Sequence, residues 1–92
     1  MSDARFPLGQ LLITARALAR LDELGISPAS FFARHQAGDW GDVHSDDAEA
    51  NEETLADGGR LLSVFQAAES CRGWIITEAD RRVTTLLLPE EY

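Results

Sequence analysis

The first half of the chain carries apolar residues at helical spacing, interrupted by capping and stop signals. The apolar stripe of residues 14–24 predicts a first helix, with the Thr14 hydroxyl as its N-terminal cap. Ser27 followed by Pro28 predicts the start of a second helix, because proline at the first helical position loses no hydrogen bond. We expect this second helix to end at Gly38.

A third helix is predicted over residues 46–57, with Ser45 as its cap and a stop at Gly58. Its first turn contains acidic residues, which the helix dipole favours at that end. Leu55 is its only large apolar residue, so we expect one side of this helix to face solvent.

After Gly59 the pattern changes to short runs that are typical of β-strands. Strands are predicted over residues 60–67, 74–77 and 83–88, and their short connections indicate a three-stranded antiparallel meander. The expected fold is therefore α+β, with three N-terminal helices packed on one face of that meander. We expect a single domain over residues 1–92 that consists of an irregular segment (1–9), a helical half (10–58), the sheet (60–88) and a tail (89–92).

Size and composition indicate a small globular protein. The 92 residues are 45% hydrophobic and 26% charged, which is typical of folded rather than disordered chains. Cys71 is the only cysteine, so an intrachain disulfide is excluded and a reducing, cytoplasmic location is expected. We expect neither an export signal nor a membrane span, because no apolar run of sufficient length is present.

The charge of the chain is unevenly distributed. The formal net charge is -8, and all eight basic residues are arginines. No arginine lies between His35 and Gly59, whereas this window holds half of the sixteen acids. Such a balance disfavours direct binding to nucleic acid or to an anionic membrane, and it favours a basic protein surface as the partner. The acids of the window are Asp39, Asp42, Asp46, Asp47, Glu49, Glu52, Glu53 and Asp57.

Four of these acids, Asp46, Glu49, Glu53 and Asp57, form what we call the acidic stripe. Their spacings of 3, 4 and 4 place them on one face of the predicted helix, about 5 to 6 Å apart. A row of carboxylates at this spacing can imitate a nucleic-acid backbone and occupy a basic groove. The alternative is a solvated face that keeps the domain soluble. The predicted partner-binding residues are Asp39, Trp40, Asp42, Asp46, Asp47, Glu49, Glu52, Glu53 and Asp57.

Trp40 and the loop around it leave two interpretations open. Trp40 lies between two glycines, where it is either an exposed binding aromatic or a lid that folds back over the core. No cofactor motif and no strong metal motif are found. A weak cation site formed by Asp39, Asp42 and His44 is the remaining metal alternative.

An enzymatic alternative rests on the histidines. His35 and His44, together with Arg60 and the Thr84-Thr85 pair, are side chains that a small toxin-type ribonuclease can use for proton transfer and phosphate stabilisation. The net charge of -8 disfavours binding of an RNA substrate, so a non-enzymatic protein is preferred. A third alternative is a structural or accessory homodimer that pairs through an exposed edge of the meander.

Four segments of the sequence resemble a family of small bacterial proteins that are found on plasmids and other mobile elements. They are FPLGQ (Phe6–Gln10), ARHQAGDWGD (Ala33–Asp42), GGRLLSVF (Gly58–Phe65) and WIITEADRRVTTLLLPEEY (Trp74–Tyr92). The resemblance implies a context in which small acidic proteins often antagonise host nucleases. We therefore expect an inhibitor of a nucleic-acid-targeting defence system, of the anti-restriction or anti-CRISPR type.

Overall fold

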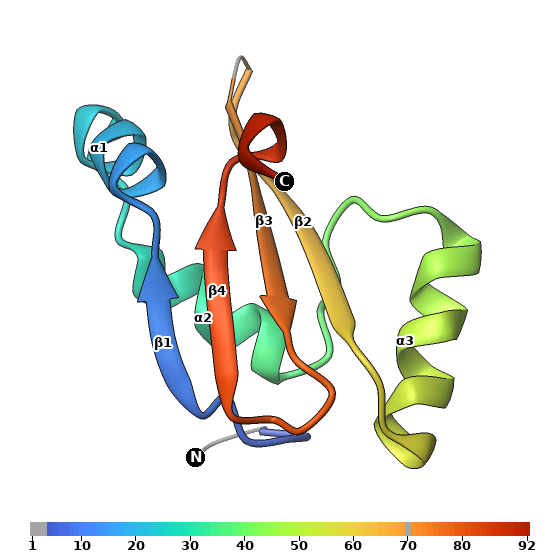
Figure 1. Ribbon diagram of the computed structural model, residues 1–92. Helices are drawn as coiled ribbons and strands as arrows, with labels where there is room; N and C mark the ends of the chain where they lie inside the picture. Colours follow the sequence, from blue (N-terminus) through green and yellow to red (C-terminus); the bar gives the residue numbers. More distant parts are fainter. Residues whose placement is uncertain (1–3, 70) are drawn as a thin grey trace.

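One mixed sheet of four strands forms the centre of the fold (Figure 1). The computed structural model describes residues 4–69 and 71–92. The strand order is β1-β4-β3-β2, where β1 pairs parallel with β4 and the other two pairs are antiparallel. The strands are β1 (Gln10–Ile13), β2 (Leu61–Ala68), β3 (Cys71–Thr77) and β4 (Val83–Leu87).

The antiparallel meander of β2, β3 and β4 is confirmed, but the predicted architecture of three N-terminal helices on that meander is wrong. Strand β1 precedes the helices and adds a parallel strand beside β4. Its sequence, Gln-Leu-Leu-Ile, lacks the alternation of a half-buried strand, and three of its four residues are exposed. What defines the strand is its hydrogen bonding to β4, in which the Gln10 amide donates to Arg82 (2.8 Å) and the Thr14 amide to Leu86 (3.0 Å). The predicted helical half therefore begins with a strand.

The three predicted helices are present. They are α1 (Ala15–Leu24), α2 (Pro28–Gln36) and α3 (Ser45–Asp57), and a short 3-10 helix, η1 (Pro89–Glu91), follows the last strand. The Thr14 and Ser27 hydroxyls cap α1 and α2 as predicted, whereas the cap position of α3 is His44, which makes no side-chain capping bond. None of the described helices has the length and apolar character of a membrane span.

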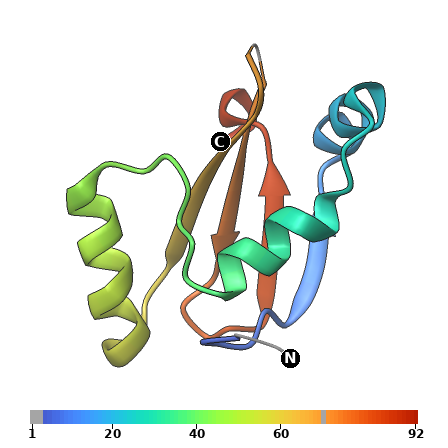
Figure 2. The same cartoon turned by 180° about the vertical axis from the view of Figure 1, so that it is seen from behind.

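Helix α2 lies across one face of the sheet, α1 lies beyond the end of β1, and α3 stands beside the edge strand β2 (Figures 1 and 2). The main core lies between α1, α2 and the sheet. On the opposite face no described α-helix lies over the strands; the short helix η1 contacts β3 there, and Tyr92 packs against Trp74 with ring centroids 5.3 Å apart. The buried core residues include Ala17, Leu21, Phe31, Phe32, Phe65, Ile75 and Leu86.

A row of hydrogen-bonded polar side chains lies within this core. The imidazole of His35 is fully buried, with Nδ1 2.5 Å from the Ser63 hydroxyl and Nε2 2.9 Å from the Thr77 hydroxyl. The Thr77 and Thr84 hydroxyl oxygens are 2.7 Å apart, and Thr84 donates to the Leu8 carbonyl. Desolvation, aided by the charge of Arg81, lowers the pKa of His35 to about 4.

The outer edge of β2 is closed by side-chain and loop contacts. Asn51 of α3 accepts from the Leu62 amide (3.1 Å) and donates to the Leu62 carbonyl (2.7 Å), as a neighbouring strand would do. The Val64 amide donates to the main-chain carbonyl of Trp40 (3.1 Å), and the Val64 carbonyl accepts from the main-chain amide of Asp42 (2.6 Å). Gly41 allows this approach, because at its φ of 73° a Cβ would fall on the Val64 carbonyl oxygen. These contacts fix the position of α3 against the sheet.

Candidate functional site

The outer face of α3 carries a row of exposed acidic side chains. Helix α3 covers the predicted range, so the acidic stripe lies on one helical face, turned away from the buried Asn51. All four stripe residues are exposed, as are Asp42 and Asp47. Among residues 4–69 and 71–92, none of these six carboxylates takes part in an ion pair.

The inner side of α3 is held by polar contacts in addition to the packing of Ala48 and Leu55 on a small apolar cluster. Besides the two bonds of Asn51, the Glu52 carboxylate accepts two hydrogen bonds from the Arg5 guanidinium, at 2.9 and 2.7 Å. Glu52 also accepts from the indole Nε1 of Trp40 at 3.0 Å. Arg81 donates to the Thr54 carbonyl at 3.2 Å, near the C-terminal end of the helix. The helix is therefore fixed at several points while its outer face stays free.

Three of the nine predicted binding residues are engaged within the fold. Trp40 is only 6% exposed and packs against Phe6, so it is the lid over the core rather than an exposed aromatic. The hydrogen bond from Arg5 and, to a smaller extent, the one from Trp40 lower the pKa of Glu52 below its usual range. Asp39 accepts from Arg34 at 2.7 Å, and this bond lowers the pKa of Asp39 in the same way. The free part of the predicted site is therefore the acidic stripe with Asp42 and Asp47.

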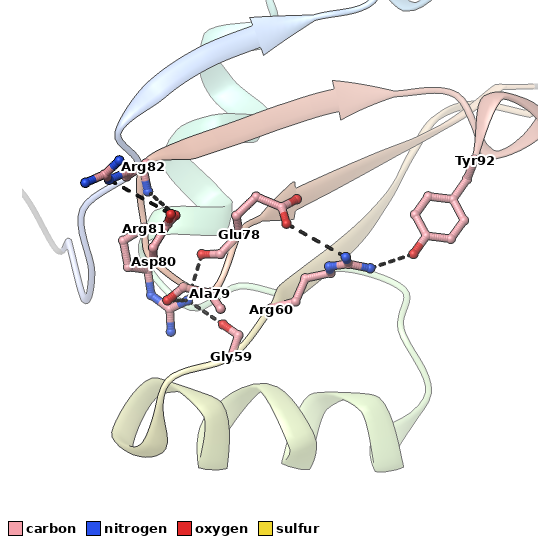
Figure 3. A network of polar contacts seen from close by, with 8 residues as sticks. All are labelled: Gly59, Arg60, Glu78, Ala79, Asp80, Arg81, Arg82 and Tyr92. Carbon is pink, nitrogen blue, oxygen red and sulfur yellow. Dashed lines mark hydrogen bonds and ion pairs between the residues drawn. The ribbon is translucent and has the colours of Figure 1, made fainter.

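Arg60 and Arg82, which Figure 3 shows, are directed to partners other than the acidic stripe. Arg60 donates to the Tyr92 hydroxyl (2.8 Å) and pairs with Glu78 (3.8 Å). Arg82 pairs with Asp80 in its own turn at 3.9 Å. The acidic stripe is thus left unneutralised even though Arg60 lies close to it in sequence.

The remaining arginines with direct polar contacts also avoid the stripe. Arg20 pairs with Glu23 on α1, and Arg72 donates to Gln66. The Arg81 guanidinium donates to the Gly59 carbonyl and lies 5.8 Å from the centre of the Phe6 ring. Because Arg81 satisfies main-chain carbonyls, its charge does not cover the carboxylates on the outer face.

The residues of the ribonuclease alternative are not brought together. His44 precedes α3 and Arg60 follows it, so the length of the helix, roughly 20 Å, separates them. His35 and Thr84 are fully buried in the row of hydrogen-bonded polar side chains within the core. The described residues also contain no group of three or more His, Cys, Asp or Glu side chains that is placed to hold a metal ion.

A shallow cleft that the sequence did not indicate adjoins the stripe. It has a volume of about 280 Å³ and lies between the start of α3 and the open face of β2 and β3. Trp74 and Arg72 contribute to it from β3, which is why no local pattern could associate them with the acids. The cleft is lined by Asp42, Val43, His44, Asp47, Leu62, Val64, Arg72 and Trp74.

Taken together, the fold and site define a small α+β protein with a four-stranded mixed sheet and a rigidly held acidic helix at one edge. No family model, curated protein or solved structure matches the chain.

Proposed function

We propose that this protein is a non-enzymatic inhibitor that binds a basic, nucleic-acid-binding surface through the acidic stripe. The observation that carries the proposal is that the four stripe carboxylates are exposed on one helical face and take part in no ion pair within the described chain. Ordinary surface helices mix charges of both signs, because opposite charges one turn apart stabilise the helix.

The way α3 is attached supports this role. A helix that repeats negative charge once per turn, about every 5.4 Å, offers a basic groove a regular row of anions. The contacts of Asn51, Glu52 and Thr54 hold that row in place before a partner arrives. Less ordering is then required on binding, which favours affinity.

The target class follows from the resemblance to small proteins of mobile elements. An element that enters a bacterial cell meets restriction endonucleases and guide-RNA nucleases, which hold nucleic acid in basic channels. An acidic protein of the anti-restriction or anti-CRISPR type competes with nucleic acid for such a channel. The partner is therefore a basic protein surface, and the protein itself needs no cofactor.

The test compares two variants that change the net charge equally. The stripe variant carries Glu49→Gln, Glu53→Gln and Asp57→Asn, and the control variant carries Asp22→Asn, Glu69→Gln and Glu90→Gln. All six positions are exposed and make no ion pair within the described residues. DNA cleavage by purified restriction endonucleases and guide-RNA nucleases is measured with each protein added.

We expect the wild-type protein to inhibit at least one nuclease and the stripe variant to inhibit it about tenfold less. This follows from ~0.5 kcal/mol for each of three exposed charges. The control variant should stay within about twofold of wild type, and inhibition should weaken as salt is raised. Equal losses in the two variants would show that net charge, and not the stripe, determines the effect. Inhibition of no nuclease in the panel would contradict the proposed target class.

A further inference from the structure

The two edges of the sheet differ in whether their outer main-chain groups are covered. The edge at β2 is closed at Leu62 by Asn51 and at Val64 by the loop of residues 40–42. The edge at β1 is short, but Gln10–Ile13 contains none of the charges, prolines or bulges that protect many exposed edge strands. The β2 edge is thus closed by four hydrogen bonds, whereas no element within the described residues covers the outer main-chain groups of Leu11 and Ile13.

The main-chain groups at the β1 edge define what fits there. The Gln10 and Thr14 amides donate to β4, so the alternation of the ladder directs the amide and carbonyl groups of Leu11 and Ile13 away from β4. Another extended strand can pair with main-chain groups of this kind, which point outward at every second residue of β1. The occupant of this edge is therefore a β-strand.

Apolar side chains gather at the same edge. Leu11 is 49% exposed and Leu12 43% exposed, although both are large apolar residues. The register places Leu11 opposite Thr84, on the face covered by α2, and Leu12 opposite Thr85, on the open face. A strand added beside β1 would cover both leucines, one from each face.

We propose that this edge binds β1 of a second copy of the protein, which creates a twofold dimer with a continuous eight-stranded sheet. The two β1 strands run antiparallel, with Leu11 of each copy opposite Ile13 of the other and the two Leu12 residues facing each other at the axis. This register uses every outward main-chain group of Leu11 and Ile13 in both copies. The edge is thus complementary to itself, as a twofold interface requires.

The charge distribution favours self-association at this edge. With a net charge of -8, two copies repel each other wherever their acids approach. Strand β1 forms one edge of the sheet, and helix α3 lies beside β2, which forms the other edge. Strand spacings of about 4.8 Å and a helix layer of about 10 Å then place the two acidic helices roughly 50 Å apart in the dimer, which is several screening lengths at physiological salt. The residues that meet at the axis are uncharged.

The decisive measurement is the mass of the full chain in solution across a concentration series. Light scattering after size exclusion, from about 1 µM to about 500 µM, should show a transition from 10.1 kDa to twice that mass. Leu12→Lys places two ammonium groups against each other at the axis and should weaken dimerisation by about 50-fold or more. Ala50→Lys adds the same charge on exposed α3 and should leave the dimer intact. Leu12 is 43% exposed and lies outside the buried core, so the fold of the variant should survive, which circular dichroism can verify.

Amide hydrogen exchange of the wild-type chain tests the register without any substitution. The Leu11 and Ile13 amides should be protected at high protein concentration and exchange freely when the sample is diluted. The Leu12 and Thr14 amides should be protected in both samples because they donate to β4. A monomer at the highest concentration, a dimer that tolerates Leu12→Lys, or concentration-independent exchange at Leu11 and Ile13 would each overturn the proposal. None of these results depends on inhibition of a nuclease, so this inference stands or falls separately from the proposed function.

Discussion

At the scale of single residues, His35 is the most perturbed titratable group that the structure describes. Its pKa in the folded state is about 4, whereas the pKa of an unfolded histidine is about 6.5. Between these values the unfolded chain binds more protons, so protonation of His35 opposes folding. The stabilisation from the neutral imidazole is complete above about pH 6.5 and is lost as the pH falls through 4. The shift corresponds to about 3 kcal/mol.

We therefore predict that the free energy of unfolding falls by up to about 3 kcal/mol between pH 7 and pH 4 because of His35 alone. His35→Gln keeps a polar side chain near Ser63 and Thr77 but removes the titration. Urea unfolding at several pH values should show that the difference between wild type and variant shrinks as the pH is lowered. Carboxylates titrate in both proteins, so their effects cancel in this difference. A constant difference over the whole pH range would be evidence against a depressed pKa at this position.

At the scale of elements, the sequence predicted those helices and strands whose signals lie within or next to the element itself. The Thr14 and Ser27 caps and the glycine stops are local signals, and the helices that they predicted are present. Strand β1 has no such signal, because its identity depends on a partner, β4, that lies about 70 residues further along the chain. The same holds for the site: helical spacing predicted the stripe, but nothing local indicated that Arg5 would pair with Glu52 across 47 residues.

Asn51 is the element-scale contact whose removal is most informative. Asn51→Ala leaves the Leu62 amide and carbonyl without partners at a closed edge, so we expect a loss of about 2 to 3 kcal/mol in urea unfolding. Amide exchange at Leu62 should accelerate at least about tenfold, whereas Val64, which donates to Trp40, should change much less. Glu53→Ala, on the exposed face of the same helix, serves as the control and should change stability by less than about 0.5 kcal/mol. A cost no larger than that of the control would mean that α3 does not need this contact.

At the scale of the whole molecule, negative charge is concentrated at the edge of the sheet that α3 occupies, and β1 lies at the other edge. This concentration works against stability. Three stripe acids, Glu49, Glu53 and Asp57, follow one another at intervals of four, so like charges are neighbours on the helix. The last turn of α3 also contains no basic residue, although the negative end of the helix dipole favours one there. A surface selected only for solubility would distribute its charges and avoid both effects.

We therefore predict that the stripe variant is more stable than the wild-type protein. Neutralising three like charges near the C-terminal end of α3 should raise the free energy of unfolding by about 1 kcal/mol in low salt. The gain should fall by more than half in about 0.5 M salt, because screening removes the repulsion that the substitutions relieve. The control variant changes the net charge equally but touches scattered positions, so its gain should be smaller and should depend less on salt. Urea unfolding of the three proteins at two salt concentrations measures these differences. A stripe variant that gains stability while it loses inhibition would show that the acids are retained for binding, since stability alone would remove them. A stripe variant less stable than wild type would instead mean that these carboxylates support the fold.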